Sequence, residues 1–136
     1  MRVSKWHKPA IACAVVFSGF SATHLIDDFL ANVPREFNLS VPLTEFLALG
    51  YMIALVGLVA AAASQSRRGY LGLAIAGLLI GLAQLMKSVP EMLLPGPWRL
   101  GWSSEVHAVG IALSGILLMV TSFLAWRDAG NAVEGA

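Results

Sequence analysis

The sequence contains few charged residues. Only 12% of its 136 residues are Asp, Glu, Lys or Arg, about half of the roughly 25% that is usual in soluble domains. A chain this short that is 57% hydrophobic could not bury its apolar side chains in a water-soluble globule, because small domains keep a large surface for their volume. The net charge of +1, without a dense cluster of Lys and Arg, also excludes a nucleic-acid-binding surface.

Cysteine and the common catalytic motifs are also scarce. The single Cys13 lies in an apolar run and cannot form a disulfide within the chain. The sequence has no Ser-His-Asp set, phosphate-binding glycine loop or nucleotide fingerprint, and it lacks the metal motifs H-x-x-x-H, E-x-x-H and C-x-x-C. We therefore do not expect a self-contained hydrolase or an ATP-driven pump.

The sequence does contain long apolar segments. A membrane-spanning helix needs roughly 20 mainly apolar residues, and four segments reach this length, at about 9–31, 43–63, 70–89 and 104–126. Proline, glycine and polar residues separate the segments. The sequence therefore predicts an all-α integral membrane protein with a single four-helix transmembrane domain over 1–128, followed by a short, polar, frayed tail over 129–136.

The basic and acidic residues gather at opposite ends of this predicted bundle. Most Lys and Arg residues fall at the end that carries both termini, and six of the eight acidic residues fall at the other end. Because cytoplasmic loops of membrane proteins carry an excess of Lys and Arg, we expect both termini to be cytoplasmic in a cell membrane. The basic residues assigned to the cytoplasmic side are Arg2, Lys5, Lys8, Arg67, Arg68 and Arg127.

The first span has an alternative interpretation as a secretory signal peptide. Residues 1–8 form a basic segment, and the apolar stretch 10–22 ends in small residues. Apolar residues continue beyond that point, with Leu25, Ile26 and Phe29, which favours a permanent span. Cleavage would leave three spans.

A weak internal repeat relates the two halves of the chain. At an offset of 60 residues, segments 44–50 and 104–110 share the pattern [ST]-E-[FV]-x-A-x-G. The pattern fits a tandem duplication of a two-helix hairpin, which would give parallel repeats. It also fits chance matches between helices rich in alanine, leucine and glycine.

Gly77 and Gly81 form a G-x-x-x-G pair in the third span. Such a pair lets two helices approach closely, within one protein or between protomers. Because four spans are few for a monomeric transporter, we expect a homo-oligomer or a larger complex in the lipid bilayer.

Ionisable residues are concentrated at the acidic end of the predicted spans. A charge inside a membrane is costly, so these residues usually face the bundle interior or water and mark a functional site. In the first span His24, Asp27 and Asp28 share one helical face, because they are three and four residues apart. The other members of this candidate polar pocket are Gln84, Lys87, Glu91 and Arg99 on or after the third span, and Glu45, Glu105 and His107 on the second and fourth.

Lys87 has two candidate partners in the first span. The repeat offset makes Asp27 and Lys87 equivalent positions, so these two residues could pair across a pseudo-twofold axis. Asp28 is the alternative partner.

Three interpretations of the pocket are compatible with its residue types. Carboxylates and imidazoles bind divalent metals in four-helix bundles, two histidines on different helices could ligate a b-type haem, and buried ion pairs with helix caps could fix the helix register. The candidate haem ligands are His24 and His107, and the candidate metal ligands are His24, Asp27, Asp28, Glu45, Glu105 and His107.

We therefore expect a small multi-pass membrane protein with a polar pocket in its extracytoplasmic half, binding a metal or protons for a membrane enzyme or transporter. One alternative is a non-catalytic accessory subunit that docks onto a larger membrane complex. The other is a haem-binding redox subunit.

Overall fold

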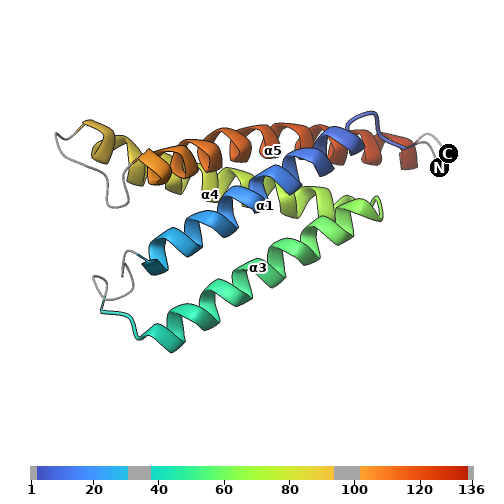
Figure 1. The fold of residues 1–136 in the computed structure, drawn as a ribbon. Helices are drawn as coiled ribbons and strands as arrows, with labels where there is room; N and C mark the ends of the chain where they lie inside the picture. The colour runs from blue at the N-terminus through green and yellow to red at the C-terminus, as the bar shows by residue number, and fades with distance from the viewer. Residues whose placement is uncertain (1–2, 31–37, 94–101, 135–136) are drawn as a thin grey trace.

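The computed structural model describes residues 3–30, 38–93 and 102–134. All regular secondary structure in these ranges is helical, and each helix is long and apolar enough to cross a membrane. The expected all-α architecture with four candidate spans is confirmed, whereas the side on which the termini lie and the tandem duplication stay predictions. The helices are α1 (His7–Leu30), α3 (Val41–Ala63), α4 (Arg67–Leu93) and α5 (Trp102–Glu134) (Figure 1).

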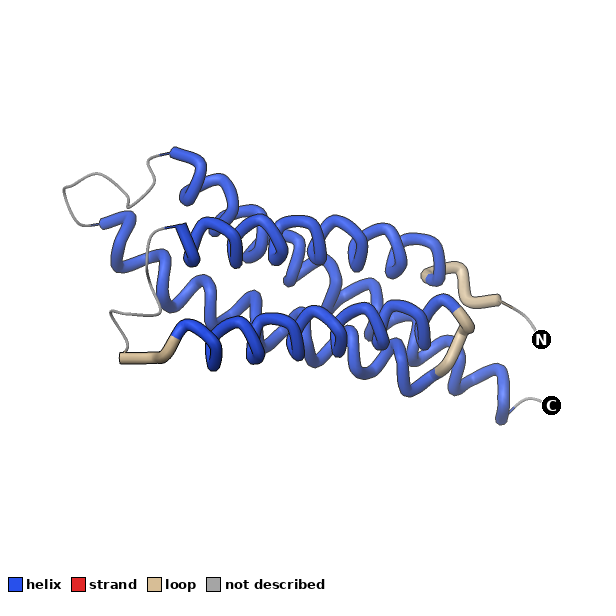
Figure 2. Tube along the Cα trace, turned by 60° about the horizontal axis from the view of Figure 1, so that its bottom comes forward, coloured by secondary structure: helices blue, strands red, loops and turns tan. Residues whose placement is uncertain are grey.

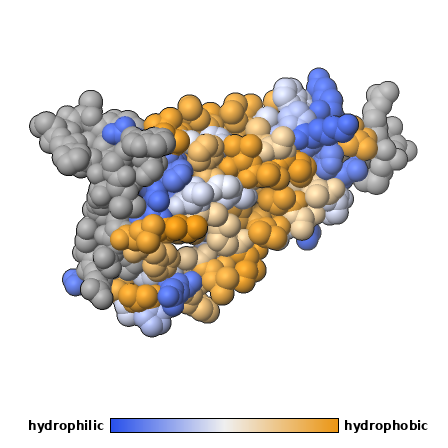
Figure 3. Space-filling view, in the orientation of Figure 1, coloured by the Kyte–Doolittle hydropathy of each residue, from blue (hydrophilic) through white to orange (hydrophobic). Residues whose placement is uncertain are grey.

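The four helices run side by side in alternating directions (Figures 1 and 2). Both termini lie at one end, which we call the N/C end, together with the turn between α3 and α4. The opposite end, which we call the distal end, is where α1 and α4 finish and where α3 and α5 begin. The visible face is mostly apolar along the middle of the helices, with hydrophilic residues toward both ends (Figure 3). This distribution suits a bundle that sits in lipid.

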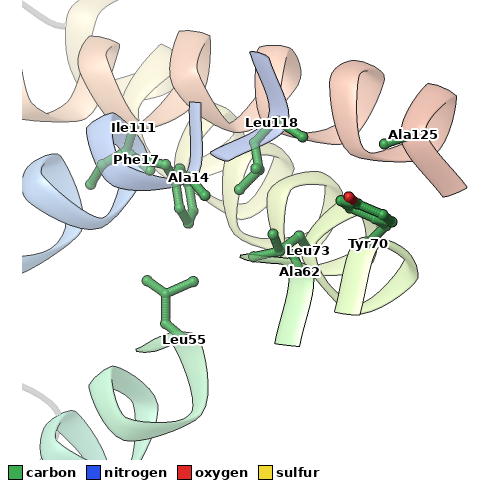
Figure 4. Close-up of a cluster of buried hydrophobic side chains, with 10 residues drawn as sticks. Ala14, Phe17, Leu55, Ala62, Tyr70, Leu73, Ile111, Leu118 and Ala125 are labelled. Carbon is green, nitrogen blue, oxygen red and sulfur yellow. The ribbon is translucent and has the colours of Figure 1, made fainter. Parts of the chain in front are cut away.

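Helix α5 is the central element, because it packs against both α4 and α1. The core is built from small and apolar side chains that include Ala14, Phe17, Leu73 and Leu118, and Figure 4 shows Leu55 approaching it from α3. Three core residues come from the first half of α1, the part that signal-peptide cleavage would remove.

Glycines allow α4 and α5 to pack backbone against backbone. A Cβ atom added to Gly77 would lie 2.6 Å from the carbonyl oxygen of Gly115, and one added to Gly115 would lie 3.0 Å from Cα of Gly81. Any larger side chain at these places would push the helices apart. The partner of the G-x-x-x-G pair is therefore α5 of the same chain.

Helix α3 is the most peripheral of the four. Its buried residues are Leu55 and Ala62, and both lie in the half nearer the N/C end. Residues 41–54 include no buried position, and in Figure 1 α3 diverges from α4 and α5 toward the distal end. The described buried residues nearest the distal end therefore lie on α1, α4 and α5.

The turn between α3 and α4 holds these helices together at the N/C end. The Gln65 N–H donates to the Ala62 carbonyl over 2.9 Å, and the Ser66 N–H donates to the Ala61 carbonyl over 3.0 Å. Gln65 has a φ of 62°, so the turn has the left-handed conformation and paired hydrogen bonds of a Schellman motif.

Helices α4 and α5 both extend beyond the predicted spans. Helix α4 continues through Pro90 to Leu93, although a proline inside a helix removes one hydrogen bond and crowds the preceding turn. Helix α5 continues to Glu134, so the prediction of a frayed tail is wrong as far as that residue.

Tertiary contacts account for the longer α5. Ser4 donates a hydrogen bond to the Asp128 carboxylate over 3.2 Å. The guanidinium of Arg67 lies 4.8 Å from the ring centre of Trp126, a cation–π contact. These contacts hold α5 in place as far as Asp128, and the helix continues from there into its polar end.

Candidate functional site

The last two turns of α1 carry three ionisable residues into the space beside α4 and α5. His24, Asp27 and Asp28 are each partly buried. Spacings of three and four residues place their side chains along one side of the helix. The apolar residues of α1 nearer the N/C end, such as Phe17, pack into the core and thereby fix the rotation of this polar side.

The tightest polar contact at the distal end joins α1 to α5. His107 Nδ1 donates a hydrogen bond to Asp27 Oδ2 over 2.5 Å. The side chain of Asp27 is 16% exposed and that of His107 is 21% exposed. Hydrogen bonds to an ionised carboxylate are shorter and stronger than neutral ones, and a low-polarity environment strengthens them further.

Asp28 is the centre of a second group that joins α1 to α4. One of its carboxylate oxygens lies 3.8 Å from Lys87 Nζ, and the other lies 3.8 Å from His24 Nε2. These distances are those of ion pairs and are longer than hydrogen bonds. Of the two candidate partners for Lys87, the structure places Asp28 beside the ammonium group and Asp27 beside His107.

The remaining pocket residues are placed differently. Gln84 is buried on α4, one turn before Lys87. Glu45 and Glu105 are exposed. Glu105 lies in the first turn of α5, where a carboxylate complements the helix dipole. Arg99 and the side chain of Glu91 lie outside the described part of the chain.

Metal and haem coordination find little support in this arrangement. Within the described ranges, no group of three His, Cys, Asp or Glu side chains is arranged to hold a metal ion. Two axial haem ligands would each need a ring nitrogen directed at the iron, but Nε2 of His24 is directed at Asp28. The described side chains instead form charge pairs at the distal end.

Sequence reasoning did not identify Tyr51 as part of this region. Tyr51 lies on α3, and its hydroxyl is buried near that of Ser21 on α1. The sequence signal that could have identified Tyr51 is its position in the interior of an apolar span. A buried tyrosine hydroxyl usually has a polar partner, so such a residue indicates other polar groups nearby.

A comparison of the chain with family models, with curated proteins and with solved structures finds no match. We therefore infer the function from five side chains at the distal end. These side chains, which we call the distal cluster, are His24, Asp27, Asp28, Lys87 and His107.

The charges of the distal cluster leave it one proton short of neutrality. Two carboxylates face one ammonium group, so with both imidazoles neutral these side chains carry a net negative charge. An imidazole changes its protonation between about pH 5 and pH 8. Aspartates and histidines inside membrane bundles characteristically form proton relays. The cluster can therefore take up a proton and share it between carboxylates and imidazoles.

Proposed function

We propose that this chain is a multi-pass membrane protein whose distal cluster binds and releases protons for a membrane transporter or enzyme. The single observation that supports it most strongly is the contact of 2.5 Å between His107 and Asp27, made by two largely buried side chains from different helices. A proton on this pair needs only a small displacement to move between nitrogen and oxygen.

The proposal includes the direction of the protein in the membrane. The distribution of Lys and Arg supports cytoplasmic termini under the positive-inside rule. The distal cluster then exchanges protons with the extracytoplasmic side.

Proton uptake by the purified protein in lipid nanodiscs tests the proposal. We expect the protein to take up protons as the pH falls from about 8 to about 5, the range in which an imidazole changes its protonation, and the histidine NMR signals to report this uptake. Asp27→Asn should reduce the uptake, because it removes the carboxylate that His107 contacts. The matched control is Tyr70→Phe, which removes the hydroxyl that hydrogen-bonds to His7 at the N/C end and should leave the distal signals unchanged.

A cluster whose residues keep fixed protonation states across this range would overturn the proposal. Such a cluster would be an ion-pair network that fixes the helix register.

A second candidate function, a non-catalytic accessory subunit, is favoured by the exposure of α3. Phe46 is 73% exposed and Ile53 is 62% exposed, so this helix offers an apolar face to lipid, to a second copy of the chain or to a larger membrane complex. An accessory subunit with a purely structural cluster predicts no proton uptake, so the same titration separates the two functions.

A further inference from the structure

Within the part of the chain that the structure describes, three buried polar atoms near the distal cluster have no hydrogen-bond partner. They are Oγ of Ser21, Nδ1 of His24 and the hydroxyl oxygen of Tyr51. Buried polar groups without a partner are rare, and each one in a native protein calls for an explanation such as a bound water or a catalytic role.

The three atoms belong to one place in the bundle. Ser21 and His24 are three residues apart on α1 and therefore lie on the same side of that helix. The Tyr51 hydroxyl on α3 lies near the Ser21 hydroxyl. Ser21 is only 4% exposed, so these groups cannot obtain their hydrogen bonds from bulk solvent.

His24 connects this place to the distal cluster. Its Nε2 lies 3.8 Å from Asp28, while its Nδ1 is the buried nitrogen without a partner. An imidazole can accept a proton at one nitrogen and release one from the other. His24 is therefore placed between a charged group and a pair of hydroxyls.

We infer that Ser21, His24 and Tyr51 together bind a water molecule, and that this water extends the proton route from Asp28 through His24 to the interface of α1 and α3. The inference rests on the proposed function of the distal cluster. A buried water typically makes about three hydrogen bonds to otherwise unsatisfied polar groups, which matches the three atoms here.

Proton transfer along this route needs no further reactant. The Asp28 carboxyl and Nε2 of His24, which lie 3.8 Å apart, must first close to hydrogen-bond distance. The O–H bond of protonated Asp28 then breaks as an N–H bond forms at Nε2, and the N–H bond at Nδ1 breaks as the water accepts that proton. The proton stays on the water, where the Ser21 and Tyr51 oxygens accept hydrogen bonds from it. Asp28 has lost one proton and the water has gained one, and the reverse transfers restore the starting state.

The site is tested by NMR detection of bound water in nanodiscs containing ¹⁵N-histidine-labelled protein. We expect magnetisation transfer between water and the His24 ring in the wild type. The transfer should fall at least severalfold in Tyr51→Phe and in Ser21→Ala, each of which removes one hydroxyl. The His107 signals should stay unchanged, which shows that both variants fold.

Thr23→Ala is the matched control. The Thr23 hydroxyl is on the same helix but donates to the carbonyls of Gly19 and Phe20, so its removal should leave the transfer from water to His24 intact. Transfer that is absent in the wild type, or that survives in both Tyr51→Phe and Ser21→Ala, overturns the inference.

The outcomes also separate the two proposals. A distal cluster that titrates without a water contact at His24 overturns the extended route alone. A distal cluster that does not titrate overturns the proposed function and the route with it.

Discussion

Asp27 and Asp28 are adjacent residues with the same side chain, but they have different partners. Asp27 accepts a hydrogen bond from His107 on α5, and Asp28 lies beside Lys87 on α4. Neighbouring residues of a helix point about 100° apart, so two consecutive carboxylates can serve two different helices. The Asp-Asp pair thus connects α1 to both α4 and α5.

This division predicts a specific pattern of charge rescue. Combining Asp28→Lys with Lys87→Asp should restore stability that either single change loses, because the opposite charges again lie together. The gain should be below about 1 kcal/mol, since Lys87 is 39% exposed and solvent weakens partly exposed ion pairs. Thermal unfolding of the single and double variants in detergent measures this coupling.

Asp27→Lys combined with Lys87→Asp is the comparison. It should show no rescue, because Asp27 lies beside His107 and not beside Lys87. Equal rescue by both double variants would contradict the pairing seen in the structure.

At the level of helices, the closest interface is that of α4 with α5. The backbones touch at Gly77 and Gly115, and the same two helices carry Lys87 and His107, which meet Asp28 and Asp27 of α1. Helix packing in lipid depends on van der Waals contact between small residues, because burial of apolar surface gives no advantage there. The glycine contact therefore determines the geometry of the distal end.

Gly77→Ala should destabilise the bundle. Its new methyl group would meet the Gly115 carbonyl at 2.6 Å and the Met119 nitrogen at 2.9 Å. Both are backbone atoms that cannot move aside. Overpacking of this kind costs about 1–3 kcal/mol, measurable as a lower unfolding temperature in detergent.

Gly57→Ala on α3 is the matched control. A Cβ atom there has nothing within 4 Å, so this variant should keep or raise the unfolding temperature through the higher helix propensity of alanine. If both variants were equally stable, the close approach of α4 and α5 would be wrong.

The local sequence determines where the helices lie in the chain, but it determines the residues at which they end less closely. Four apolar segments of the required length predicted four candidate spans, and the structure has a helix over each. The end of α5 was predicted too early, because residues after Asp128 are polar. Their helical state depends on distant residues such as Arg67, whose guanidinium lies beside Gly130.

For the whole molecule, the unequal distribution of charge predicts the orientation in the membrane. Asn38 is exposed beside the start of α3 at the distal end, and Ser64 is exposed at the N/C end. In a Cys13→Ala background, Asn38→Cys should react with a membrane-impermeant maleimide in intact cells. Ser64→Cys should react only after the cells are made permeable, because positively charged ends face the cytoplasm.

The opposite labelling pattern would place the distal cluster on the cytoplasmic side. Labelling of neither position before permeabilisation would show that the distal end is covered in cells.

The sequence by itself determined that this chain is helical and suited to a membrane, because the length and hydropathy of each segment decide whether a helix is stable in lipid. It also identified His24, Asp27, Asp28, Lys87 and His107 as residues of interest, since ionisable groups are costly inside a membrane. Only the tertiary structure decided how these residues pair, and that Glu45 stays exposed on a diverging α3. Pairing depends on the rotation of each helix about its own axis and on how closely the helices pack. Contacts between residues that are far apart in the sequence, such as Gly77 with Gly115, determine both the rotation and the packing.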